Sequence, residues 1–164
     1  MYFDDKEKTY NFILNTAIGD ILLAERGGYI IMSSFSQMPV EGTFQQTDLL
    51  RAASLQLDEY FCGKRKRFDL PIRTIGTKFQ QEVLNEFIKI PYGQTRSYAE
   101  MARGIGKEKA ARAVGNAAGA NKLAILIPCH RVIHSSGDIS GFSSGNQRKK
   151  FLLDLEKKYM GFLA

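Results

Sequence analysis

A segment whose residue types could support a reaction follows an apolar run: Pro128, Cys129, His130 and Arg131. Proline fixes φ and lacks a backbone donor, so Pro128 ends the run and sets a rigid turn that presents the cysteine. A thiol is nucleophilic as its thiolate, which neighbouring positive charge or an imidazole base favours. The segment therefore predicts a reactive Cys129 with two potentially cationic neighbours. The alternative is a small buried cysteine at the end of a strand.

The remaining cysteine and histidine do not complete a metal site. Cys62 lies beside Gly63 and a basic run, far from Cys129 in sequence. The sequence leaves a disulfide between the two cysteines possible, but a reducing compartment favours two separate free thiols. His130 and His134 are the only histidines, and no Cys-x-x-Cys or His-x-x-x-His pair stands at finger spacing from a second pair. No metal is therefore predicted.

The composition is that of a globular protein of one or two domains. The chain has 164 residues, of which 44% are hydrophobic and 24% charged, so a hydrophobic core is expected. No apolar run approaches the length of a membrane span, and the N-terminus shows no signal-peptide pattern. These features predict a cytoplasmic protein without a membrane partner.

The positive charge is concentrated in one half of the chain. Residues 1–76 carry nine Lys/Arg and ten Asp/Glu, whereas residues 77–164 carry fourteen Lys/Arg and seven Asp/Glu. Such asymmetry indicates a polyanionic partner for the half that contains Cys129. A solvated basic face without a ligand is the alternative. The basic run at residues 64–67 lies in the acidic half and is interpreted as an exposed turn.

The N-terminal half has the pattern of a small sheet with one helix. Alternating residues and Gly turns over residues 9–35 predict a β-meander. Apolar residues at helical spacing predict a helix over 47–61, with Thr47 or Asp48 as N-cap. Residues 68–71 are expected to form a last strand. A linker over 71–78 then separates a domain of residues 1–76 from a domain of residues 77–164.

The C-terminal half is expected to be helical. Thr77 with Gln80, and Ser97 with Glu100, have the spacing of capping boxes that begin two helices. A second short helix over 107–119 follows a glycine-containing turn, so the pair suggests a helix-turn-helix. This second helix consists largely of Ala and Gly around Arg112. Such a helix packs closely on a core neighbour or in a DNA groove, and Lys107 and Lys109 beside Arg112 favour the groove.

These segments together resemble the O6-alkylguanine-DNA alkyltransferases. The resemblance covers the C-terminal half without a gap and the N-terminal half more loosely. It is carried by the following segments: Pro128-Cys129-His130-Arg131-Val132-Ile133, Ile90-Pro91-Tyr92-Gly93, Ser97-Tyr98, Ala110-Ala111-Arg112-Ala113-Val114-Gly115, and Leu152-Leu153 with Glu156. No zinc-binding regulatory module is present, so the chain is similar to the stand-alone form. One departure is Phe142, where many relatives have tyrosine.

The resemblance implies an α+β fold and a self-alkylating DNA-repair reaction. The fold would be an N-terminal β-meander plus helix, ribonuclease H-like, followed by a mostly helical, winged helix-turn-helix-like domain. The substrate would be O6-alkylguanine, with O4-alkylthymine as a further target, in double-stranded DNA, and the base would be flipped through the minor groove. The alkyl group would move to Cys129 in a single turnover. No cofactor and no obligate protein partner are implied, and the protein would act as a monomer.

The resemblance also implies roles for particular residues. Cys129 would be the acceptor, with His130 acting on it through a water and Glu156 holding the imidazole. A water bridge suits adjacent residues in extended chain, whose side chains point apart. Asn121 would be a hinge, and Tyr98 would help to rotate the nucleotide and donate a proton. Two further sets are implied: substrate contacts at Tyr98, Val132 and Ser143, and DNA contacts at Ala110, Ala111, Arg112, Gly115 and Ser135.

Three other functions compete with this one. A cysteine hydrolase would need an oxyanion hole and an acyl groove, and the basic Ala/Gly helix speaks against it. A non-enzymatic lesion binder of the alkyltransferase-like kind would lack the acceptor cysteine. A winged-helix regulator would use a bulkier polar recognition helix in the major groove.

Overall fold

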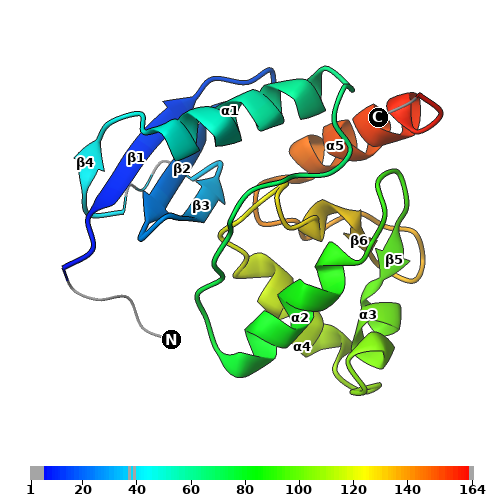
Figure 1. Cartoon of the computed structure of the whole chain (residues 1–164). Coiled ribbons are helices and arrows are strands. Elements are labelled where there is room, and N and C mark those ends of the chain that lie inside the picture. Colours follow the sequence, from blue (N-terminus) through cyan, green and yellow to red (C-terminus); the bar gives the residue numbers. More distant parts are fainter. Residues whose placement is uncertain (1–5, 37, 39, 163–164) are drawn as a thin grey trace. The chain divides into compact units, whose positions relative to one another are not determined.

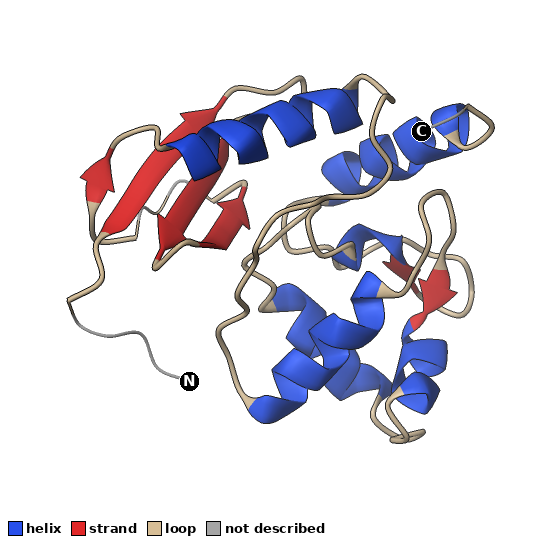
Figure 2. Ribbon diagram, in the orientation of Figure 1, coloured by secondary structure: helices blue, strands red, loops and turns tan. Residues whose placement is uncertain are grey.

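The computed structural model describes residues 6–36, 38 and 40–162. The chain divides into two compact units between Arg73 and Thr74, just ahead of the boundary expected after residue 76. The first unit is a sheet with a helix and the second is mainly helical, so the predicted α+β class is confirmed (Figures 1 and 2). No helix among the described residues is long and apolar enough to cross a membrane.

The first unit is built on a four-stranded sheet. Strands β1 (Thr9–Leu14), β2 (Ile21–Arg26) and β3 (Tyr29–Ser34) form the predicted antiparallel meander. A short strand β4 (Thr43–Phe44), which the sequence pattern did not indicate, pairs in parallel with β1 at the sheet edge. Helix α1 (Asp48–Phe61) is capped by Thr47, one of the two predicted caps, and packs its apolar face on β1, β2 and β3 (Figure 1).

The last strand predicted at residues 68–71 is wrong. These residues form no strand, and the only ladder contact nearby is an isolated bridge between Ile30 and Ile72. Pro71 accepts a hydrogen bond from the Ile30 amide but has no amide hydrogen to return. A regular ladder therefore does not extend along this segment.

The second unit begins with the two helices whose caps were predicted. Helix α2 (Lys78–Ile88) begins with a complete capping box of Thr77 and Gln80. Helix α3 (Tyr98–Gly104) begins with a complete capping box of Ser97 and Glu100. Helix α4 (Ala111–Gly119) packs on both α2 and α3. The α3–turn–α4 pair has the predicted helix-turn-helix arrangement.

Helix α4 is shorter than the predicted helix over 107–119. Residues 107–110 form a turn after Gly106, whose φ of 70° lies in the left-handed region that favours glycine. The Lys107 side chain pairs with Glu82 of α2. Lys107 therefore contacts α2, and it does not belong to the same helical face as Arg112.

The rest of the second unit holds the Pro-Cys-His-Arg segment. Cys129–Arg131 form a single 3₁₀ turn, which leads into β6 (Val132–Ile133). Strand β6 pairs in parallel with β5 (Arg96–Ser97), and helix α5 (Asn146–Tyr159) contacts the 3₁₀ turn. The expectation of extended chain at Cys129 and His130 is therefore wrong, because Val132 donates its amide hydrogen back to the Cys129 carbonyl and closes the turn.

Candidate active site around Cys129

The backbone before Cys129 is a tight turn made by Pro128. Pro128 has φ −80° and ψ 60°, and the Cys129 amide donates to the Ile127 carbonyl at 2.8 Å. These values define an inverse γ-turn, for which the proline ring supplies the required φ. The thiol is 4% exposed, so the turn buries the sulfur that it presents.

The side-chain amide of Asn121 joins helix α4 to this turn. Its Nδ2 lies 3.1 Å from both the Ile127 carbonyl oxygen and the Cys129 Sγ, and its Oδ1 accepts from the Leu123 amide at 2.9 Å. In the segment between Asn121 and Cys129, the buried Ile125 has a φ of 71°, a conformation that costs free energy for a β-branched residue. The Asn121 hydrogen bonds and the packing of Ile125 hold the segment in this shape.

Glu156 lies at the centre of a buried hydrogen-bond network. Its carboxylate lies 2.7 Å from His130 Nε2, accepts from Arg131 at 2.9 Å and accepts from the Gly93 amide at 3.0 Å. Arg131 also donates to the Ile90 carbonyl at 2.7 Å. Glu156 and His130 are fully buried and Arg131 is nearly so. The Arg131 guanidinium, which was expected to favour the Cys129 thiolate, is therefore paired with Glu156 instead.

The network determines the protonation of the imidazole. A carboxylate only accepts, so His130 Nε2 carries the hydrogen and Nδ1 keeps the lone pair. Burial lowers the pKa of His130, although the hydrogen bond and charge of Glu156 oppose it. Burial alone would raise the pKa of Glu156, but the hydrogen bonds from His130 and Arg131, the charge of Arg131 and the charge that His130 carries when protonated lower it to about 2. The resting site thus holds a neutral imidazole beside an ionised carboxylate.

The resting thiol is protonated, contrary to the expectation of a thiolate favoured by its neighbours. Burial raises the pKa of Cys129, and the hydrogen bond from Asn121 and the charge of Lys149 offset only part of this effect. A nucleophilic sulfur therefore requires a base that removes the proton during the reaction.

Lys149 is a site residue that the sequence analysis missed. It is fully buried, and its Nζ donates to the Val132 carbonyl at 2.5 Å. Burial lowers its pKa, which the charge of Asp138, and that of Cys129 when it is a thiolate, oppose. On α5 it shares the buried face with Leu152 and Glu156. That spacing was the available signal, because a lysine at an inward-facing helical position is costly without a specific role.

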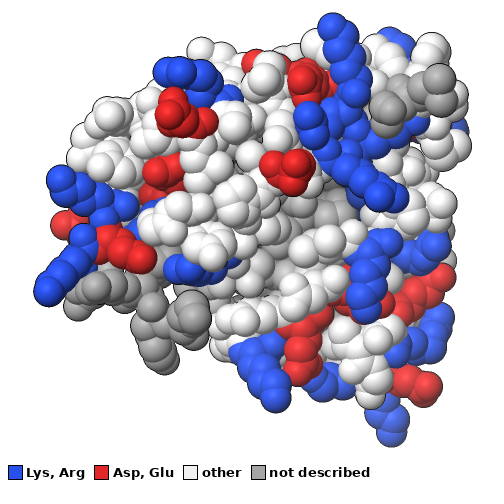
Figure 3. All heavy atoms as spheres, in the orientation of Figure 1, with Lys and Arg blue, Asp and Glu red and all other residues white. Residues whose placement is uncertain are grey.

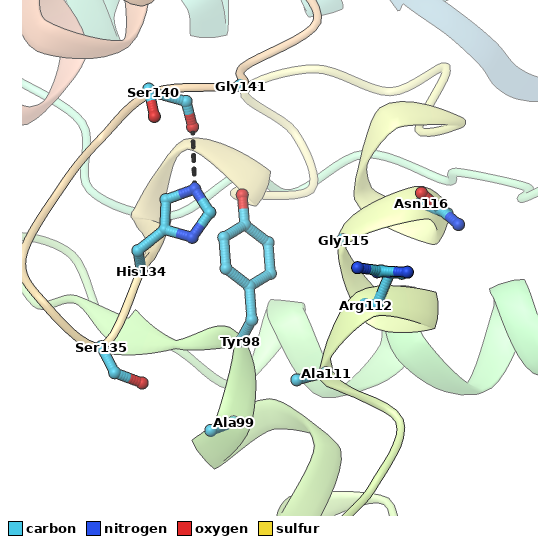
Figure 4. A pocket seen from close by; sticks show the side chains of 10 residues that line it. All are labelled: Tyr98, Ala99, Ala111, Arg112, Gly115, Asn116, His134, Ser135, Ser140 and Gly141. Atoms are coloured by element: carbon cyan, nitrogen blue, oxygen red, sulfur yellow. Dashed lines mark hydrogen bonds between the residues drawn. The ribbon is translucent and has the colours of Figure 1, made fainter.

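A pocket with a volume of about 460 Å³ is lined in part by Tyr98, which interacts electrostatically with Cys129. Figure 4 shows the Tyr98 side chain between those of His134 and Arg112. Burial raises the pKa of Tyr98, and the charge that Cys129 carries as a thiolate raises it further, so the hydroxyl keeps its proton. The lining comes from α3, α4 and the loop after β6: Tyr98, Ala99, Ala111, Arg112, Gly115, Asn116, His134, Ser135, Ser140 and Gly141.

The structure brings together most of the residues that the sequence singled out, but not all. Four of the expected substrate and DNA residues besides Tyr98 line the pocket: Ala111, Arg112, Gly115 and Ser135. Ala110 precedes them as the N-cap of α4. Val132 is buried, with its carbonyl bonded to Lys149, and Ser143 lies exposed in the loop before α5. Neither lines this pocket.

Charge on the surface is mixed. On the face drawn in Figure 3, acidic side chains lie among the more numerous basic ones. Arg112 is exposed at the start of α4, beside exposed Ala113. A small-residue surface with one arginine is therefore accessible to a polyanion. Among the described residues, no group of three His, Cys, Asp or Glu side chains could hold a metal ion.

Comparison with known proteins covers both units. Residues 78–158 match the DNA-binding domain of the 6-O-methylguanine DNA methyltransferases, and residues 7–74 match their ribonuclease-like domain. A methylated-DNA–protein-cysteine methyltransferase of Methanosarcina acetivorans is 44% identical over 152 residues, covering 90% of this chain and 97% of the relative. The constitutive enzyme of Bacillus subtilis is 40% identical over 157 residues, covering 90% and 95%.

Solved structures of similar proteins have the same fold. The O6-methylguanine methyltransferase of Mycobacterium tuberculosis superposes with a TM-score of 0.86 at 39% identity, covering 92% of this chain and 94% of that one. A structure of the M. tuberculosis protein in complex with DNA gives the same score, identity and coverage.

Proposed function

Because the chain belongs to the 6-O-methylguanine DNA methyltransferase family, we propose that it repairs alkylated DNA by transferring an alkyl group to its own Cys129. The substrate is O6-alkylguanine in double-stranded DNA, with O4-alkylthymine as a second target. One observation carries the proposal: a buried thiol, next to a neutral histidine held by an ionised glutamate, interacts with Tyr98, which lines a pocket together with Arg112. The protein acts as a monomer and needs no cofactor.

The proposed reaction is a displacement at saturated carbon. The proton of the Cys129 thiol passes to His130 Nδ1 through a water, and Glu156 stabilises the imidazolium that forms. The sulfur attacks the alkyl carbon, forming an S–C bond while the C–O6 bond breaks. The guanine leaves as an anion and takes a proton from the Tyr98 hydroxyl. The proton held on His130 later reprotonates Tyr98.

The product explains why the reaction occurs once per molecule. An alkyl thioether has no good leaving group, and no step in the scheme regenerates the thiol. Atoms and charge balance overall, since the proton lost by the thiol replaces the alkyl group on guanine. The protein is therefore consumed in stoichiometric amounts with the lesion.

The first experiment tests the acceptor. After reaction with a duplex that contains O6-methylguanine, intact mass should show one added methyl group, and peptide mapping should place it on Cys129. Cys62→Ser is the matched control, because this exposed thiol lies in the first unit. It should react like wild type, whereas Cys129→Ser should not react. A methyl group on Cys62, or several turnovers per protein, would contradict the proposal.

Access to the base requires that the nucleotide leave the duplex, because O6 lies inside the stack. The exposed Arg112 side chain, at the start of a helix of small residues, suits a minor-groove approach in which it fills the space left by the base. The backbone of Val132 and Ser143 is proposed to read the guanine edge, with the second lone pair of the Val132 carbonyl available beside Lys149. Phosphate contacts make binding weaker as salt rises.

Arg112→Ala should slow repair of a base-paired lesion by roughly ten-fold or more, since unstacking costs a few kcal/mol. Reaction with the free O6-alkylguanine base should change much less, because no extrusion is needed. Rate constants for duplex and free base give the comparison. Arg51→Ala, which removes an exposed charge from the first unit, serves as the control. An equal loss for both substrates would mean that Arg112 has a structural role.

A further inference from the structure

The two short strands of the second unit place Tyr98 and His134 next to each other. In the parallel β5–β6 ladder, Ser97 lies opposite Ile133, so the residues that follow these two emerge side by side. The Tyr98 and His134 rings have centroids 5.2 Å apart and planes tilted by 56°. On the other side, a Cβ added to Gly115 would lie 3.8 Å from Tyr98. His134 and α4 thus flank Tyr98 (Figure 4).

His134 also supports the rim of the pocket. Its Nε2 lies 3.2 Å from the Ser140 carbonyl oxygen, and its amide donates to the Asp138 carbonyl at 2.9 Å. Because a carbonyl only accepts, Nε2 is the donor. Ser140 in turn donates its amide to the Asp138 carboxylate at 3.0 Å. Hydrogen bonds between residues of the same loop therefore hold residues 134–140 together, and the His134 imidazole forms one of them.

If the guanine enters the pocket at Tyr98, as the proposed function requires, a large substituent on its O6 extends toward these contacts. In an in-line displacement, the sulfur, the reacting carbon and O6 lie on one line, so the remainder of a bulky group extends sideways toward the pocket walls. On the proposed function, α4 faces the DNA. The walls that remain are Tyr98 with His134 and the rim at Ser140 and Gly141.

We propose that His134 is a positioning residue that sets the alkyl-group specificity of the pocket. Its ring keeps Tyr98 in place against α4, and its hydrogen bond to Ser140 keeps the rim close to the lesion. The pocket therefore accepts a methyl group and disfavours a bulky substituent such as benzyl. The inference rests on the proposed alkyl transfer to Cys129 and adds a residue to which that reaction assigns no role.

The test compares rate constants for alkylation of Cys129 by duplexes that contain O6-methylguanine or O6-benzylguanine. In His134→Ala, the methyl rate should fall and the ratio of the benzyl to the methyl rate should rise by roughly ten-fold, a size typical of a changed pocket wall. A merely structural role would lower both rates together. Thermal unfolding should change little, because His134 is exposed.

Two conservative variants separate the ring from the hydrogen bond. His134→Phe keeps a ring against Tyr98 and loses the donor, so it should retain more of the methyl rate than His134→Ala and still have a raised ratio. His134→Asn keeps a donor for Ser140 and loses the ring, so it should have a slow methyl rate and a ratio near that of wild type. Ser136→Ala, in the same loop, is the control, and its ratio should be that of wild type.

The outcomes are distinct. If wild type alkylates Cys129 and the ratio in His134→Ala stays within two-fold of wild type, the specificity role is wrong and the proposed function stands. If wild type transfers neither group to Cys129, the proposed function fails and the inference fails with it.

Discussion

Replacement of Glu156 by glutamine should lower the free energy of unfolding by about 3–5 kcal/mol, the usual cost of breaking a buried ion pair. The carboxylate accepts hydrogen bonds from His130, Arg131 and the Gly93 amide and is fully buried. Glutamine offers one oxygen in place of two and no charge, so Arg131 would remain buried without its counter-ion. Chemical denaturation of the variant and wild type measures the difference.

The same network should make the protein sensitive to acid. The pKa of Glu156 is lowered from an ordinary 4.5 to about 2, so its contribution is present above about pH 4.5 and is lost as pH falls toward 2. The lowered pKa of His130 acts in the same direction, because below its ordinary 6.5 the unfolded chain binds a proton that the folded protein does not. Stability should fall from about pH 6.5 downward.

Asp154→Asn is the matched control for Glu156→Gln. Asp154 lies on the same helix and pairs with Lys150, but both side chains are more than half exposed. Exposed pairs contribute little, so the variant should unfold at nearly the wild-type denaturant concentration. Between pH 4.5 and 2, Glu156→Gln should also show a flatter stability curve than wild type. Equal stability of the two variants would contradict the assignment of Glu156 as the centre of the network.

Replacement of His130 by alanine should slow alkyl transfer by roughly 10²-fold or more, as expected for loss of a general base. The thiol of Cys129 has a raised pKa and therefore needs a proton acceptor near neutral pH. The neutral imidazole, oriented by Glu156, is the group beside it in sequence and in the 3₁₀ turn. Single-turnover kinetics on a methylated duplex measure the loss.

The pH profile distinguishes a lost base from a damaged fold. As pH rises, the thiol ionises without assistance, so the rate of His130→Ala should approach that of wild type. DNA affinity should stay near the wild-type value, because His130 is buried away from the surface. A gap between the two rates that is constant at all pH values would contradict a role in proton transfer.

The sequence by itself determined the features that depend on neighbouring residues. The capping boxes of Thr77 with Gln80 and of Ser97 with Glu100 join residues three apart, so their spacing was sufficient to place α2 and α3. The inverse γ-turn at Pro128 is a local property of the proline ring. The Cys129–His130 pair was also visible from adjacency alone.

Only the tertiary structure decided the features that join distant residues. Arg131 forms an ion pair with Glu156, which is twenty-five positions away in sequence. The buried Lys149 donates a hydrogen bond to the Val132 carbonyl, and the His134 ring packs against Tyr98. The tertiary structure also replaced the expected strand at residues 68–71 by irregular chain. Burial, which raises the pKa of Cys129 and lowers that of His130, depends on how α5 and α2 pack around the turn. Such packing depends on contacts across the whole unit, and no short sequence pattern encodes them.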